Sequence, residues 1–425
     1  MMLNKGKIFL YFDRIIITCL CFLFFCLPFA KAGAETFTWL AVFLWMLKRV
    51  LGYRGQSFWG LLPTTELNKV LGVLVLANFI SVIFSTHFGI SLRGFFGKEL
   101  KFIIIFFMLV ESISSKRRLK VILTVITIST MLLIADSAVQ YYSGKDFLRG
   151  YAWARLTASL TTANGFSAWL IVIIPLFLGL LFDPKIINKR VKFILYPLIG
   201  ALLICLLMTY SRGGWLGLII GLLLMAWYVF KDFKLKIKIL SLSVIVGFFA
   251  IFLILPQPIR AKVDAIGRVN FRSSGTVNSR IKLTLKTGEG STPIRFHLWG
   301  ESLRLVRDYP LTGCGLNTYS TVARNYKSFY WGGVYPHNSY LQMAAEIGLL
   351  GLFVFFWFLF TFFRMGLRHF KKSKNYLVLG LLSGILAFLA HAFFDTHLYS
   401  LQLVVLFWFM LGFTIAVIKL SEEQL

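Results

Sequence analysis

The stretch Tyr335-Pro336-His337-Asn338-Ser339-Tyr340-Leu341 closes the only long polar interval of the chain, which runs from about Gln257 to Asn338. On both sides of this interval, apolar segments are joined by short connectors. Of the 425 residues, 58% are hydrophobic, 17% are aromatic and only 15% are charged. Because so little polar surface cannot cover a soluble core of ordinary shape, the composition predicts an integral membrane protein.

The apolar segments indicate helices, since about 20 helical residues cross a hydrocarbon core of roughly 30 Å and satisfy their own backbone hydrogen bonds. We predict an all-α polytopic membrane protein with about 12 transmembrane helices and one large periplasmic loop between helices 9 and 10. Residues 1–256 would hold helices 1–9, residues 257–337 the loop with short amphipathic helices, and residues 338–425 helices 10–12. The expected spans are Ile15 to Ala30, Phe37 to Leu47, Val70 to Thr86, Phe102 to Ile113, Leu119 to Gln140, Gly165 to Phe182, Phe193 to Tyr210, Trp215 to Phe230, Ile239 to Leu255, Tyr340 to Phe363, Tyr376 to His391, and Leu398 to Lys419.

Lysine and arginine are concentrated in every second connector, which predicts that both termini are cytoplasmic and that the long loop lies outside the cytoplasm. The same rule explains the net charge of +28, so we do not expect the protein to bind nucleic acid. The predicted partner of its apolar surface is the lipid bilayer. Another interpretation of the start is a cleaved signal peptide, because Ala30-Lys31-Ala32 follows an apolar run.

The sequence contains no pattern typical of a metal or nucleotide site. Only one of the five cysteines, Cys314, lies in the long loop. There is no Walker loop, no dinucleotide fingerprint and no His-Glu-x-x-His arrangement. We therefore expect neither a metal nor a cofactor.

A short helix is expected inside the long loop. Thr292-Pro293 is typical of an N-cap followed by the first helical residue, and Pro310 would end the helix. Phe296, Trp299, Leu303 and Val306 recur at three- and four-residue spacing and predict one apolar stripe. Arg295 would lie one turn from Trp299, whose indole could orient its guanidinium.

Two residues are the strongest candidates for chemistry. Arg212 lies in Tyr210-Ser211-Arg212-Gly213-Gly214 between two apolar spans, where it either clamps a phosphate or snorkels from a tight helical hairpin. His337 stands at the entrance of the next span, where Asn338 or Ser339 can cap the helix. Its imidazole either accepts a proton from a hydroxyl or only contributes to the cap.

Further ionisable residues are predicted on the same side of the membrane. They are Arg93 and Lys98, Arg155 just ahead of Asn164, and the pair His391 and Asp395, four residues apart and expected on one helical face. The pair could instead serve a structural hydrogen bond between helices, and Glu346 allows the same two interpretations. Many cations without paired carboxylates favour an anionic substrate.

Several motifs in the second half of the chain resemble the O-antigen ligase and O-antigen polymerase superfamily of bacterial envelope glycosyltransferases. The resemblance rests on Ser211-Arg212-Gly213-Gly214, on Arg295 with Trp299, on Tyr309 to Tyr319, on Pro336 to Leu341, and on Glu346 to Gly351, in that order. The first half matches only in topology and in Arg155 with Asn164. Residues 271–290 match no pattern of the family.

The resemblance implies a metal-independent, inverting transfer of a glycan from undecaprenyl diphosphate to a sugar hydroxyl. The acceptor would be a lipid A core or another glycan, on the periplasmic face of the bacterial cytoplasmic (inner) membrane. Arg212 and Arg295 would bind the diphosphate and His337 would act as the general base. The remaining implied substrate contacts, to diphosphate or sugar, are Arg93, Lys98, Arg155, Asn164, Trp299, Asn338 and Asp395.

Two other functions remain open at this point. A polysaccharide polymerase or a protein O-oligosaccharyltransferase of the same superfamily would share the site, because the identity of the acceptor has no readable signature. A transporter of a lipid-linked glycan would use a similar basic cavity without a base. Transporters often show internal repeats and broken helices, and neither is evident in the sequence.

Overall fold

The computed structural model describes residues 5–52, 62–148, 150, 155–183, 189–229, 291–326 and 335–423. In these ranges the chain forms helices and no β-strand. Seven of the helices are long and apolar enough to cross a membrane, and two shorter apolar helices accompany them. The predicted all-α, multi-pass membrane architecture is confirmed for this part of the chain.

Each expected span that falls in the described ranges overlaps a helix, whereas the span Ile239 to Leu255 and much of the long loop lie outside them. The total of about 12 spans and the placement of the loop therefore stay predictions. The elements are α1 (Lys5–Cys26), α2 (Lys31–Gly52), α3 (Asn68–Ile83), α4 (Phe88–Gly94), the π-helical η2 (Phe95–Glu99), α5 (Leu100–Ser112), α6 (Lys116–Ser143), α7 (Ala163–Phe182), α8 (Lys189–Met208), α9 (Arg212–Val229), α13 (Ser291–Asp308), α14 (Tyr319–Val322), the 3₁₀ helix η3 (Ala323–Tyr326), α15 (Ser339–Ser373), α16 (Tyr376–Ala392), the 3₁₀ helix η4 (His397–Tyr399) and α17 (Leu401–Glu422).

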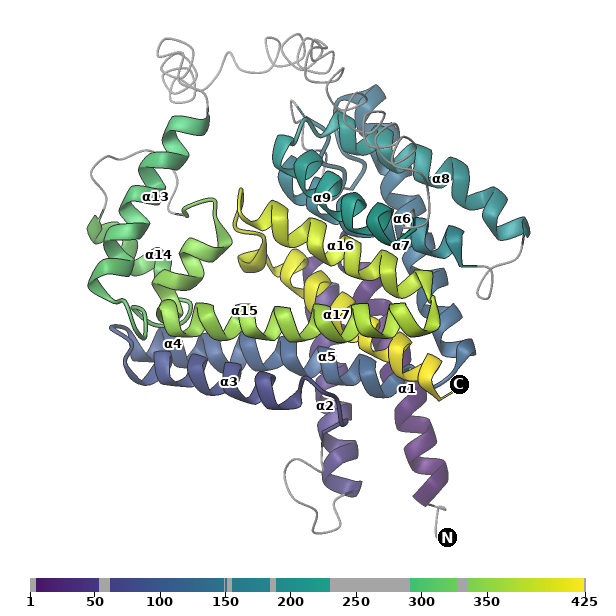
Figure 1. Ribbon diagram of the computed structural model, residues 1–425, viewed down its shortest axis with the longest axis horizontal. Coiled ribbons are helices and arrows are strands. Elements are labelled where there is room, and N and C mark those ends of the chain that lie inside the picture. Colours follow the sequence, from purple (N-terminus) through teal and green to yellow (C-terminus); the bar gives the residue numbers. More distant parts are fainter. Residues whose placement is uncertain are drawn as a thin grey trace.

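The last three long helices form the centre of the bundle (Figure 1). Helix α16 packs against α7 and α9, α17 against α5, and α15 against α3. Small residues permit the closest of these contacts. A Cβ added to Gly217 or Gly221 of α9 would lie 2.6 Å from Ala387 O or 2.4 Å from Ser383 O of α16. The glycines of α9 therefore hold it directly on α16.

Helix α15 is interrupted at Gly348, which has φ 71° and ψ 177°. The turn that follows α13 packs into this break: Leu349 N donates to Pro310 O at 2.8 Å, and Cys314 N donates to Ala345 O at 2.8 Å. A Cβ on Gly348 would lie only 2.0 Å from Leu311 O, so no larger residue fits. The sequence shows no evident broken helix, and the structure corrects this expectation at Gly348. The break depends on the turn after α13, which replaces helical hydrogen bonds there and leaves no local pattern in the sequence.

Helix α13 lies beside the first turns of α15, at one end of the bundle (Figure 1). The expected helix is present, but the predicted apolar stripe is only partly correct. Phe296 and Leu303 are 62% and 55% exposed, whereas Leu298, Leu305 and Val306 are buried. The buried face is the one that α15 and the turn after α13 cover, so tertiary contact rather than spacing selects it.

Candidate functional site

The centre of the candidate site is a hydrogen bond of 2.9 Å between His337 Nδ1 and Asp395 Oδ1. His337 immediately precedes the N-cap of α15 and has φ 49°, a left-handed conformation that is uncommon for residues with a side chain. Asp395 lies in the turn between α16 and η4, since α16 ends at Ala392. The expectation that His391 and Asp395 share one helical face is therefore wrong; the helix stops between them.

The backbone on both sides of His337 is held in place. The indole Nε1 of Trp299 on α13 donates to Pro336 O at 2.8 Å, and its ring meets Phe393 edge-on with centroids 5.5 Å apart. Asn338 caps α15, because its Oδ1 accepts from the backbone N–H groups of Tyr340 and Leu341 at 2.9 and 3.1 Å. Trp299 and Asn338 thus fix the position of the imidazole.

These contacts change the expected roles of Trp299 and Asn338. Asn338 is 2% exposed, so its amide serves the helix cap and has little surface for a substrate. The described residues show no contact of the Arg295 guanidinium over the Trp299 ring, although the one-turn spacing suggested one. Instead, the indole N–H is used by Pro336 O.

Asn164, at the start of α7, supports Asp395 from the other side. Its Nδ2 donates to Asp395 Oδ2 at 2.7 Å. Its Oδ1 accepts from Arg155 Nη2 at 3.2 Å and from Ser211 Oγ at 3.0 Å. Arg155 is anchored in turn by its Nε, which donates to Thr209 O at 2.6 Å. One continuous network therefore joins the segments that precede α7 and α9 to the catalytic candidate His337.

The electrostatic environment keeps Asp395 ionised. Burial by itself would raise the pKa of Asp395, but the hydrogen bond from His337 and the neighbouring His397 bring that pKa well below its ordinary value. Burial lowers the pKa of Arg155, and the nearby charge of Arg295 lowers it further. Burial also lowers the pKa of His397 to about 4, with a further contribution from Arg295. Arg295 is thus close enough to act on groups on both sides of Asp395.

Arg212 approaches the same turn from α9, of which it is the first residue. The next residue, Gly213, lies so close that an added Cβ would be 2.9 Å from His391 Cδ2 and 3.1 Å from Phe394 Cβ. Arg212 is exposed, and in the described ranges neither it nor Arg295 forms an ion pair with a carboxylate. The start of α9 with Arg212 thus lies beside His391 and Phe394, and the charge of Arg295 acts on Arg155 and His397. Among the described residues these two cations have no paired carboxylate, and together with a helix N-terminus they suit an anion.

Residues 197–356 match the O-antigen ligase family. This match confirms the superfamily resemblance drawn from the sequence. The matched region, residues 197–356, contains Arg212, Arg295 and His337, while Asn164 and Asp395 lie outside it. No curated protein sequence matches the chain. The match of residues 197–356 to this family, together with the apolar helices, supports a membrane protein with a glycosyltransferase-like function.

Arg93 and Lys98 do not join this network. Arg93 is exposed, and its Nε donates to Gly89 O at 3.2 Å within α4. Lys98 Nζ donates to Asn317 Oδ1 at 2.5 Å, and Lys98 lines a separate cavity. These contacts do not support the expectation that Arg93 and Lys98 bind the same diphosphate as Arg212.

Several residues of the network were not singled out from the sequence. Ser211 stood inside the motif Ser211-Arg212-Gly213-Gly214, so its neighbours were the signal that could have found it. His397, buried against His391 with ring centroids 4.2 Å apart, had no such signal. Among the described residues, no group of three or more His, Cys, Asp or Glu residues could hold a metal ion.

Proposed function

We propose that this chain is a glycosyltransferase of the O-antigen ligase type, which moves a glycan from undecaprenyl diphosphate to a sugar hydroxyl of a lipid A core. The reaction would take place at the periplasmic face of the bacterial inner membrane, with both termini in the cytoplasm. The observation that carries the proposal is the 2.9 Å pair of His337 and Asp395 near two arginines that form no ion pair with a carboxylate in the described ranges. A base next to an anion site is what transfer from a diphosphate donor requires.

His337 is the proposed general base. Ionised Asp395 accepts the Nδ1–H, which leaves the lone pair on Nε2 free to take a proton, and the imidazole side chain is 42% exposed. As Nε2 removes the proton from the acceptor hydroxyl, that oxygen attacks the anomeric carbon of the donor sugar. The bond from this carbon to the diphosphate oxygen breaks, and its electron pair leaves with the diphosphate. Attack opposite the leaving group inverts the configuration at the anomeric carbon.

Arg212 and Arg295 are the proposed diphosphate contacts. Negative charge grows on the leaving diphosphate in the transition state, and preorganised guanidinium groups stabilise it without reorganisation. The N-terminus of α9, which begins at Arg212, adds backbone N–H groups of the same polarity. Arg155 acts one step away, because its guanidinium holds Asn164 and through it Asp395.

Transfer by the purified full-length chain tests this function. The donor is an undecaprenyl-diphosphate glycan, the acceptor is lipid A core, and each assay is run with and without a chelator. We expect His337→Ala and Arg212→Ala each to lower the transfer rate by about 10²–10⁴-fold, the range of a lost general base or charge stabiliser. The matched controls are His297→Ala and Arg304→Ala, exposed residues of α13, which should transfer like the wild type.

The products separate the possible acceptors. Lengthening of the lipid-linked glycan with the core untouched would make the chain a polymerase, and transfer to a protein serine would make it a protein glycosyltransferase. Loss of wild-type transfer on chelation would contradict the metal-independent mechanism. Absence of transfer to every acceptor would overturn the enzyme proposal in favour of transport.

A further inference from the structure

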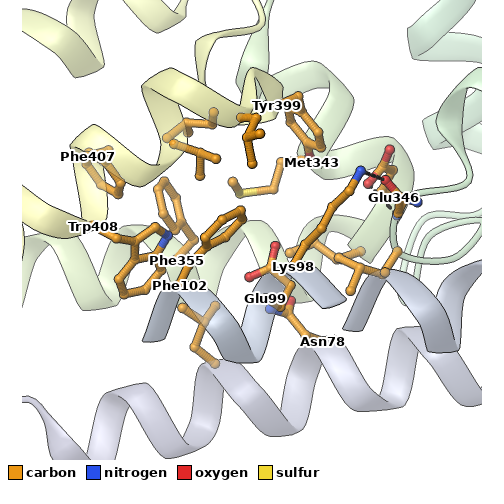
Figure 2. Close-up of a pocket in the computed structure, with 18 residues that line it drawn as sticks. Asn78, Lys98, Glu99, Phe102, Met343, Glu346, Phe355, Tyr399, Phe407 and Trp408 are labelled. Carbon is orange, nitrogen blue, oxygen red and sulfur yellow. Dashed lines mark hydrogen bonds between the residues drawn. The ribbon is translucent and has the colours of Figure 1, made fainter. Parts of the chain in front are cut away.

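A cavity separate from the His337–Asp395 pair is lined by residues of α3, α5, α15 and α17 (Figure 2). Its volume is about 110 Å³. This volume holds several waters or a small head group, and it is far below the ~300–1,000 Å³ of an ordinary small-molecule pocket. Aromatic side chains form much of its wall: Phe102, Phe355, Tyr399, Phe407 and Trp408.

Hydrogen-bond acceptors without donors collect at one end of the cavity. Asn78 is only 3% exposed, and its Oδ1 has no hydrogen-bond partner among the described residues. The carboxylate of Glu99 lies near it at the cavity wall (Figure 2), and in the described ranges it has neither a hydrogen bond nor an ion pair within 4.0 Å. A buried acceptor without a partner, such as Asn78 Oδ1, is rare, because it loses hydration without compensation. The Glu99 side chain beside it is half-buried, so its carboxylate is within reach of a ligand.

The other charged residues at this end do not supply the missing donors. Lys98 Nζ donates to Asn317 Oδ1 at 2.5 Å, and Figure 2 shows its chain reaching past Glu99 toward Glu346. The carboxylate of Glu346 is already used, since it accepts from Asn317 N at 2.7 Å and from Gln342 Nε2 at 3.2 Å. Lys98 is also the exposed residue of the lining, so it marks the rim of the cavity.

We propose that this cavity binds a primary ammonium group, carried by an ethanolamine phospholipid or by a free amine. An ammonium offers three N–H donors, which match the Glu99 carboxylate and Asn78 Oδ1, and aromatic ring faces attract cations. In a phospholipid head the phosphate is adjacent to the amine, where Lys98 at the rim meets it. This site goes beyond the proposed glycan transfer, no step of which depends on it.

Calorimetric titration of the full-length chain in detergent tests the site. The probes are short-chain phosphatidylethanolamine, phosphatidylglycerol, which has the phosphate but no amine, and ethylammonium chloride. We expect the ethanolamine lipid to bind about tenfold more tightly than the glycerol lipid, a typical effect of a desolvated ammonium on aromatic faces. Glu99→Gln should abolish this preference, and Glu66→Gln, an exposed matched control, should keep it.

Asn78→Asp is a second variant whose expected effect is opposite to that of misfolding. It adds a second carboxylate and should strengthen ammonium binding, whereas a damaged fold can only weaken it. Ethylammonium that binds as tightly as the lipid, and depends on Glu99, would identify a free amine as the ligand. Equal binding of both lipids without ethylammonium binding, or a Glu99→Gln variant that retains the preference, would overturn the proposal.

Discussion

Two charged clusters of this protein use ionisable residues in opposite ways. Where α1, α2 and α5 meet, Lys48 Nζ lies 2.5 Å from both Asp13 Oδ1 and Glu111 Oε1, and Arg49 also pairs with Glu111. Every charge of this Lys48 cluster has an opposite partner. Around His337 the imidazole is 42% exposed, and Arg212 forms no carboxylate pair in the described ranges. Charges that are paired internally stabilise the bundle, whereas those without partners are available to a substrate.

Asp395→Asn has the largest expected effect, because it changes the partner of His337. The amide keeps the size of the side chain, but it can donate to Nδ1 and thereby place the proton on Nε2, the atom that must accept one. We expect the turnover rate to fall by up to about 10⁴-fold, the loss that the same exchange causes in a serine protease triad. The measurement is initial transfer rates at saturating acceptor.

Asp308→Asn is the matched control for this exchange, since Asp308 is exposed and, among the described residues, its side chain accepts a hydrogen bond from Tyr326 on the surface of the protein. It should transfer like the wild type. A turnover rate in Asp395→Asn within threefold of wild type would contradict an orienting role of the carboxylate.

The Lys48 cluster should respond in stability instead. Glu111→Gln removes the charge that Lys48 and Arg49 share, while its side chain is 22% exposed, so water compensates part of the loss. We expect about 1–3 kcal/mol of destabilisation, less than the 3–5 kcal/mol of a fully buried pair. Thermal unfolding in detergent measures the loss, and transfer per folded molecule should stay unchanged. Glu423→Gln, exposed at the end of α17, is the control. Equal unfolding temperatures of the two variants would contradict a stabilising role of the Lys48 cluster.

Ser211→Ala is expected to have the smallest effect on the transfer rate. It removes the hydroxyl that donates to Asn164 Oδ1 at 3.0 Å, but Arg155 still donates to the same oxygen. One neutral hydrogen bond contributes about 0.5–1.5 kcal/mol, so we expect transfer to fall about two- to tenfold. Ser143→Ala, on the exposed end of α6, is the control. A loss as large as that of Asp395→Asn would contradict this shared support, because it would mean that Arg155 alone does not hold Asn164 Oδ1 in place.

The sequence by itself determined the features that depend on local composition and spacing. Apolar runs predicted where the described helices lie, because each membrane helix satisfies its own hydrogen bonds. The order Pro336, His337 and Asn338 predicted a histidine held at a helix start, and Asn338 indeed caps α15. The motif around Arg212 similarly indicated a cation at the start of a helix, which the structure places at the first residue of α9.

Only the tertiary structure decided which of these residues meet. His337 and Asp395 are 58 residues apart, and their contact depends on the approach of α15 and α16 and on the turn that ends α16 before Asp395. The break at Gly348 and the buried face of α13 likewise depend on a neighbouring segment that fits against them. Local patterns specify what a segment can form, while packing between segments distant in the chain selects its partner, its exposed face and its chemistry.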